Sequence, residues 1–214
     1  MRGSLRLLVL LLSSAVPADV HARQSASSLS VTLTHSFGSS TAAHPGPCGA
    51  TCIPGDVLAP LSLSTLEIEL ALPLRTRPGW GLEYHVRVVP LALMTNNPTQ
   101  PALRGPLGWT LSPTTSRAST LGIGVKPVGL RVWGGSNRVR IEADAAGGML
   151  RFGTPLLASN AKRVNFAYEF GAGMRLGPSG VVLGYRRHHV SNAGFGEVNP
   201  GLDSHVLYLG VPVG

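Results

Sequence analysis

A histidine, a serine and an aspartate lie close together near the C-terminus of this 214-residue chain: His189, Ser191 and Asp203. A histidine within hydrogen-bond reach of a serine hydroxyl can act as its base, and a carboxylate can orient the imidazole and stabilise its protonated form. These residue types therefore point to nucleophilic acyl transfer, such as the hydrolysis of an ester.

The spacing of the three residues predicts that they share one face of a β-hairpin. Residues i and i+2 of a strand point the same way, so His189 lies beside Ser191. The segment 192–202 would connect this strand to an antiparallel one that carries Asp203. Asp203 lies on the same face whether it pairs with Ser191 or, after a two-residue slip, with His189.

That face is otherwise apolar, which predicts where the three residues would act. Leu183 and Tyr185 share the phase of His189, and Leu207 shares the phase of Asp203. If this apolar face lies against membrane lipid, ionisable residues on it are costly unless they have a function. An enzyme whose substrate arrives sideways from the membrane would give them one. The alternative is that His189 and Ser191 are ordinary residues at the level of the lipid headgroups.

The elements that must position these residues are strands, because apolar and polar residues alternate with a period of two along most of the chain. One segment changes phase at Pro127, which predicts a β-bulge there. Connections between the segments alternate between long and short, as in outer-membrane barrels. Clear alternation covers about 29–37, 65–75, 82–88, 120–133, 137–144, 164–176, 180–191 and 203–213. The long connections are expected at about 38–64, 95–119, 151–162 and 192–202.

The pattern predicts an all-β fold, an eight-stranded antiparallel transmembrane up-and-down β-barrel. Opposite charges on the polar phases suit a narrow lumen filled by side chains. A water-soluble, lipocalin-like barrel is the alternative, and it would carry apolar residues inside. The expected lumen residues are Glu67, Glu69, Glu83, Arg87, Arg138, Arg140, Glu142, Glu169, Arg175 and Arg186.

The N-terminus has the features of a secretory signal, with Arg2 and Arg6 ahead of a short apolar core. We expect residues 1–22 to be a signal peptide and residues 23–214 to form the barrel domain. Beyond the leader, no apolar run approaches the roughly 20 residues that a spanning helix needs. Export favours a disulfide between Cys48 and Cys52 in an outer loop, with a metal-binding pair as the alternative.

The formal net charge of +8 favours an anionic partner. No nucleic-acid-binding motif is present, so a phosphorylated lipid is the partner that we expect. Arg187 shares the face of His189 and is a candidate for contacting a lipid phosphate, with simple snorkelling to the interface as the alternative. His188, His189 and His205 could suggest zinc, but His188 faces the lumen, so we expect neither a metal nor another cofactor.

The C-terminal part of the chain resembles the lipid A 3-O-deacylase (PagL) and related acyloxyacyl hydrolase family. The similarity begins at the strand from Phe166 to Leu176 and continues through Leu183-Gly184-Tyr185. It is most specific in His189-x-Ser191-Asn192-Ala193-Gly194, followed by Asn199-x-Gly201 and an acid at 203. Upstream of Phe166 the match is one of strand pattern.

The resemblance implies a serine esterase of the bacterial outer membrane that releases a fatty acid from lipid A of lipopolysaccharide in the outer leaflet. It implies that His189 is the general base, Ser191 the nucleophile and Asp203 the orienting acid. It further implies that Asn199 helps to hold the oxyanion and that Asn192 is a positioning neighbour.

One departure from the family pattern is Asp203, where the deacylase carries Glu. Aspartate keeps the charge but is one methylene shorter, which brings catalytic efficiency into question. The alternative is a non-catalytic barrel of the same fold with a degenerate site. The acyl position that is cleaved, activity on phospholipids and assembly into a homo-oligomer stay open.

Overall fold

The computed structural model describes residues 27–43, 56–58, 61–96, 119–136, 138–155, 162–177, 179–196 and 199–213. The proposed leader 1–22 and the pair Cys48 and Cys52 lie outside the described residues, so these two expectations stay predictions. In the described part of the chain, no helix is both long and apolar enough to cross a membrane.

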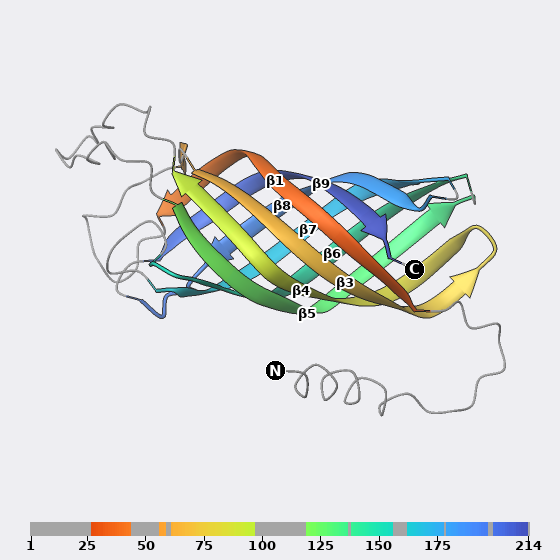
Figure 1. The fold of residues 1–214 in the computed structure, drawn as a ribbon, viewed down its shortest axis with the longest axis horizontal. Helices are drawn as coiled ribbons and strands as arrows, with labels where there is room; N and C mark the ends of the chain where they lie inside the picture. Colours follow the sequence, from red (N-terminus) through yellow and green to blue (C-terminus); the bar gives the residue numbers. More distant parts are fainter. Residues whose placement is uncertain are drawn as a thin grey trace, which may run out of the picture.

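Eight antiparallel strands form a closed barrel, in which each strand pairs with its neighbour in the sequence and β1 also pairs with β9 (Figure 1). The strands run obliquely across the barrel, and the start of β1 lies at the same end as the C-terminus. The barrel strands are β1 (Ser28–Ala43), β3 (Leu61–Arg77), β4 (Trp80–Asn96), β5 (Ser119–Gly135), β6 (Val139–Phe152), β7 (Val164–Leu176), β8 (Val181–Ser191) and β9 (Pro200–Pro212).

The predicted fold is confirmed, and several strands, β1 and β3 among them, are longer than predicted, whereas β7 and β8 match the prediction to within one residue. Most of the extra length lies at the end of the barrel where the long connections emerge, which we call the long-loop end. β1 reaches Ala43 and β6 reaches Phe152, so the strands extend beyond the region of clear alternation. A short additional strand, β2 (Asp56–Leu58), pairs with the end of β1 inside the first long connection.

The outer face of the barrel is apolar and its lumen is polar. This is the predicted arrangement, and it is the reverse of that in a soluble lipocalin-like barrel. Large apolar side chains cover the outer wall, where a lipid bilayer can solvate them. The exposed side chains include Leu29, Leu33, Phe37, Ile68, Leu121, Ile123, Val128, Leu130, Ile141, Phe166, Phe170, Leu183, Leu207 and Leu209.

Buried charges of both signs fill the middle of the lumen. Arg87 is fully buried, and its guanidinium forms ion pairs with Glu69, Asp144 and Glu169 from three other strands. Lys126 Nζ lies 2.6 Å from a carboxylate oxygen of Glu67 and 2.7 Å from one of Glu169. We call this the lumen network; its members are Glu67, Glu69, Arg87, Lys126, Arg131, Glu142, Asp144, Glu169 and Arg186.

The lumen differs from the prediction at its two ends. Arg138, at the short turn before β6, is exposed. Arg140 keeps the inward phase of Glu142, as predicted, and stacks on Trp133 with its guanidinium carbon 4.3 Å from the ring centre. At the long-loop end an apolar cluster replaces the charges. Its members are Leu63, Val89, Ala92, Met94, Leu150, Phe152, Ala167, Val190 and Leu202. The wall that carries His189 is thus backed by close-packed apolar side chains.

The phase change at Pro127 is a β-bulge, as predicted. The pairing of β5 with β6 shifts register between Val125 and Val128. Lys126 points into the lumen, and both Pro127 and Val128 are exposed outside. The extra residue lets one strand place an ammonium inside without turning its apolar residues inward on either side.

Candidate active site

The β8–β9 hairpin brings His189 and Asp203 directly opposite each other. Of the two registers that the sequence allowed, the structure has the slipped one, in which His189 pairs with Asp203 and Arg187 with His205. All four side chains are on the outer wall, because Arg186, His188 and Ser204, which alternate with them, are buried in the lumen. This part of the wall is therefore polar, whereas most of the outer wall is apolar.

A hydrogen bond joins the two members of the central pair. His189 Nδ1 lies 3.1 Å from Asp203 Oδ1, and the two side chains are 13% and 21% exposed. A carboxylate only accepts hydrogen bonds, so Nδ1 carries the proton and Nε2 presents a lone pair. His189 is thereby held in the tautomer that a general base toward a hydroxyl requires.

Ser191 ends β8 and lies one i+2 step beyond His189 on the same outer face. Its side chain is half-exposed, and its backbone pairs with Phe166 of β7. Among the described residues, the hydrogen bonds do not include one from the Ser191 hydroxyl to the His189 ring. The structure thus joins histidine and acid directly and leaves the serine adjacent to them, as is common in sites without substrate.

A tight turn follows Ser191 at once. The carbonyl of Asn192 accepts a hydrogen bond from Phe195 N–H at 3.1 Å, and its side-chain Oδ1 accepts one from Gly194 N–H at 3.0 Å. Ala193 and Gly194 have φ angles of 52° and 81°. An alanine in the left-handed region is strained, so the surrounding contacts must hold it there. Asn192 itself is buried and fixes the chain immediately after the serine.

Asn199 lies across this turn and ties it to the start of β9. Its Oδ1 accepts a hydrogen bond from the backbone N–H of Asn192 at 2.9 Å. Because this bond uses the carbonyl end of the side chain, the Nδ2 amide is the end that could donate to a ligand. The two asparagines singled out in the sequence are therefore in contact, and both are adjacent to Ser191.

Tyr168 is a site residue that the sequence did not single out. It pairs with His189 across β7 and β8, and the two rings stack with their centres 4.7 Å apart at 25°. The stacked ring restricts the rotation of the imidazole. Alternation alone placed Tyr168 on the lipid-facing phase of its strand, but its contact with His189 depends on a cross-strand register that no local pattern gives.

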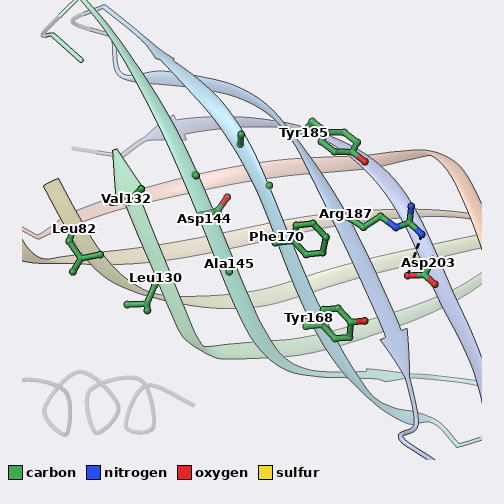
Figure 2. A pocket seen from close by; sticks show the side chains of 13 residues that line it. Leu82, Leu130, Val132, Asp144, Ala145, Tyr168, Phe170, Tyr185, Arg187 and Asp203 are labelled. Atoms are coloured by element: carbon green, nitrogen blue, oxygen red, sulfur yellow. Dashed lines mark ion pairs between the residues drawn. The ribbon is translucent and has the colours of Figure 1, made fainter. Parts of the chain in front are cut away.

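An open groove of about 960 Å³ runs along the outer wall from Asp203 toward the opposite end of the barrel (Figure 2). Its floor consists of small residues, Ala143, Ala145 and Ala172, on β6 and β7. Larger apolar side chains border it. Those labelled in the figure are Leu82, Leu130, Val132, Tyr168, Phe170 and Tyr185.

The other polar candidates do not form a second centre in the described part of the chain. Arg187 is half-exposed on the outer wall between His205 and Asp203. His188 points into the lumen, away from His189 and His205. Among the described residues, no group of three or more histidine, cysteine or acidic side chains is arranged to hold a metal ion.

The outer wall holds one further histidine–serine pair, which is a useful comparison. His35 Nδ1 lies 2.8 Å from Ser64 Oγ across β1 and β3. Among the described hydrogen bonds and ion pairs, none joins His35 to a carboxylate. This pair therefore lacks the acid that orients His189.

A protein-family model for lipid A 3-O-deacylase (PagL) matches residues 73–212, which span the site and seven of the eight barrel strands in whole or in part. The chain belongs to this family. The match begins within β3, so it leaves out His35 and Ser64 and includes His189, Ser191 and Asp203.

Several solved structures also match the chain, each with a TM-score below 0.5. The crystal structure of the outer membrane enzyme PagL has 15% identity and a TM-score of 0.49, covering 85% of this chain and 99% of that one. OprG from Pseudomonas aeruginosa has 13% identity, a TM-score of 0.41 and coverages of 91% and 99%. Ail of Yersinia pestis has 10% identity, a TM-score of 0.38 and coverages of 87% and 97%. No curated protein matches the sequence.

Family membership and the apolar outer wall place this protein in the bacterial outer membrane. In such barrels the long connections are extracellular and the short turns periplasmic. The candidate site, at the end of β8 and the start of β9 beside a long connection, therefore lies near the extracellular surface of the membrane.

Proposed function

We propose that this protein is a lipid A deacylase that uses Ser191, His189 and Asp203 to hydrolyse an acyl ester of lipid A in the outer leaflet. The observation that carries the proposal is the 3.1 Å hydrogen bond between His189 and Asp203 on the outer wall, with Ser191 next to them on the same face. An ionisable pair facing lipid is costly, and hydrolysis of a membrane lipid gives a reason for it.

In the proposed reaction Ser191 Oγ attacks the ester carbonyl carbon while His189 Nε2 takes the hydroxyl proton. The carbonyl becomes a tetrahedral oxyanion, toward which the Nδ2 amide of Asn199 can donate. When the intermediate collapses, the bond to the sugar oxygen breaks, and that oxygen receives the proton from His189. Asp203 stabilises the imidazolium throughout.

The acyl-enzyme is resolved by water. His189 Nε2 takes a proton from a water molecule as its oxygen attacks the acyl carbon. The bond to Ser191 Oγ then breaks, the serine recovers its proton, and a free fatty acid leaves. Each step uses residues of a single hairpin, so the mechanism does not depend on a second copy of the chain.

The groove supports a long acyl chain as the part of the substrate bound by the wall. It begins at Asp203 and is lined by apolar side chains over a floor of alanines, which leaves room for a chain lying flat against the strands. Because the chain would enter the groove from lipid hydrocarbon and not from water, its binding there would depend on van der Waals packing against the wall. Arg187, which lines the groove beside Asp203, is the candidate for contacting a lipid phosphate.

Mass spectrometry of lipid A from cells that express the wild type, Ser191→Ala or Ser64→Ala tests the proposal. We expect loss of one ester-linked acyl chain with the wild type and with Ser64→Ala, and unmodified lipid A with Ser191→Ala. Ser64 is the control, because it is a wall serine that is hydrogen-bonded to a histidine with no carboxylate beside that histidine among the described contacts. Unmodified lipid A in all three strains, with folded barrels present, would support the non-catalytic alternative, and release of fatty acid from phospholipids alone would change the substrate.

A further inference from the structure

Four polar side chains form a compact block on the outer wall of the β8–β9 hairpin, and we call them the polar quartet: Arg187, His189, Asp203 and His205. They make up two successive cross-strand pairs, His189 with Asp203 and Arg187 with His205. Contacts also run diagonally within the block, because Arg187 Nη2 lies 3.8 Å from Asp203 Oδ1 (Figure 2). The block thus connects the proposed catalytic pair to a second pair that the mechanism does not use.

The hydrogen bonds of the second pair fix the protonation of His205. Arg187 Nη1 lies 3.1 Å from His205 Nε2, and a guanidinium can only donate. His205 Nε2 must therefore accept, so the ring is neutral and carries its proton on Nδ1. That nitrogen lies 2.7 Å from the hydroxyl oxygen of Tyr185, to which it donates. The ring of Phe37 packs 5.9 Å from His205 on its other side.

This arrangement constrains Arg187, which in turn faces the acid. One arm of its guanidinium is held by His205, so the other is directed at the same Asp203 oxygen that accepts the His189 hydrogen bond. An aspartate has two side-chain torsions and a carboxylate that can rotate away from its partner. A fixed positive charge beside Oδ1 favours the orientation in which that oxygen faces His189.

We propose that Arg187 and His205 are positioning residues that hold the Asp203 carboxylate against His189. The inference rests on the proposed esterase function and deepens it. It gives a physical reason for a site that works with aspartate where the family pattern has the longer glutamate: the guanidinium supplies from the side the restraint that the shorter side chain lacks.

The same residues weigh against a phosphate as the main partner of Arg187. Its side chain is 34% exposed, and both of its terminal nitrogens face groups of the protein. An arginine used only for a lipid phosphate would have no need of a histidine locked in a single tautomer beside it. The two roles also differ in a measurable way, because a phosphate contact cannot affect a substrate that has no phosphate.

The first test is hydrolysis of a neutral p-nitrophenyl ester by the purified protein in detergent. Arg187→Gln should lower kcat about 10- to 100-fold with little change in KM, by analogy with the loss seen when groups that orient the side chains of a metal site are removed. Arg187→Lys should fall between it and the wild type, because one ammonium cannot span both partners. An unchanged kcat for Arg187→Gln on this ester would overturn the inference.

A matched pair at His205 separates positioning from packing. His205→Gln keeps an acceptor for Arg187 and a donor for Tyr185, and it should retain most of the wild-type kcat. His205→Leu keeps the bulk and removes both bonds, and it should lose activity as Arg187→Gln does. Equal loss in the two variants would show that His205 serves only the packing of the wall and would overturn its assigned role.

A second measurement is independent of activity. Two-bond ¹H–¹⁵N spectra of ¹⁵N-histidine-labelled protein should show His205 with its proton on Nδ1 in the wild type. In Arg187→Gln, the His189 Nδ1–H signal should broaden through faster exchange with water. Observing His205 with its proton on Nε2, or an unaltered His189 signal, would overturn the inference even if the wild type hydrolyses esters. An inactive wild type with the expected spectra would instead refute the proposed function.

Discussion

The lumen network and the polar quartet use similar residue types in opposite situations, and the two sets meet on β8. Arg186 and His188 point inward, and Arg187 and His189 point outward. The inner arginine is fully buried and forms ion pairs with Glu67, Asp144 and Glu169. The outer histidine, His189, has one carboxylate partner, Asp203, at Nδ1. Its Nε2 is the nitrogen that can accept a proton from a hydroxyl.

The contrast shows how a barrel separates stability from chemistry. Buried charges must be paired, because an unpaired one costs several kcal/mol, and the carboxylates of the lumen network are already bound by arginine and lysine side chains. On the outer wall, partial exposure makes an incomplete set of partners tolerable. The pleat of the strand, which turns successive residues to opposite sides, is what separates the two roles.

The largest expected effect distinguishes two adjacent histidines. His189→Ala should lower ester hydrolysis by about 10³-fold or more, because the base of the serine is removed. The barrel should fold normally, since this side chain lies outside the lumen. Initial rates of ester hydrolysis measure the activity, and the heat-modifiable mobility of the barrel on SDS gels measures its folding.

His188→Ala is the matched control, with the neighbouring side chain inside the lumen. It should keep most of its activity and lose stability. If the two variants lost activity equally, the distinction between inner and outer residues would not hold for this hairpin.

The next largest effect is on stability and concerns Arg87. Arg87→Leu leaves Glu69, Asp144 and Glu169 without their shared partner, so the free energy of unfolding should fall by about 3–5 kcal/mol. Urea unfolding in detergent measures the change. Arg151→Leu, at an exposed position of β6, should stay within about 0.5 kcal/mol of the wild type. Equal costs for the two variants would contradict the structural role of the lumen network.

A smaller effect concerns the groove. Ala172→Trp places a large ring on its floor and should slow hydrolysis of a long-chain ester about 10- to 100-fold, while an acetyl ester should be unaffected. Ile141→Trp, elsewhere on the exposed wall of β6, should change neither rate. The ratio of long-chain to acetyl ester hydrolysis is the quantity to compare. A ratio that Ala172→Trp leaves unchanged would remove the groove from the substrate site.

The smallest expected effect concerns the turn after Ser191. The left-handed conformation of Ala193 costs an ordinary residue about 1–2 kcal/mol, and a β-branched residue tolerates it least. Ala193→Val should therefore lower kcat several-fold. Ala193→Gly should be close to the wild type, because relief of strain offsets the added freedom of the unfolded chain. A tolerated valine would mean that the turn conformation is not needed.

Most of the fold could be predicted from the period-two alternation. In a closed barrel in lipid, every strand alternates apolar residues toward the lipid with polar residues toward the lumen. The bulge at Pro127 followed for the same reason, since a change of phase in the sequence has to appear as an extra residue in the ladder. The apolar cluster behind the site did not follow. Val190 and Leu202 point into the lumen next to the site, at positions where the alternation predicts polar residues. The sequence does not show which side chains they pack against.

The candidate site was predictable in its residues but less so in its contacts. His189, Ser191 and Asp203 could be placed on one face from spacing alone, but the choice between two registers needed the structure. The stacking of Tyr168 and the diagonal contact of Arg187 depend on which residues are opposite across strands, and this information is not local in the sequence. The resemblance to the deacylase family supplied the two asparagines, which spacing alone would have left as turn residues.

Covalent trapping tests the central claim most directly. The folded protein in detergent is treated with an alkyl fluorophosphonate, which reacts with activated serine hydroxyls, and the modified peptide is identified by mass spectrometry. We predict a single adduct on Ser191 that is absent from His189→Ala and much reduced in Asp203→Ala. An adduct on another serine, such as Ser64, or equal labelling of Ser191 in His189→Ala, would contradict the assignment of the outer-wall hairpin as the catalytic centre.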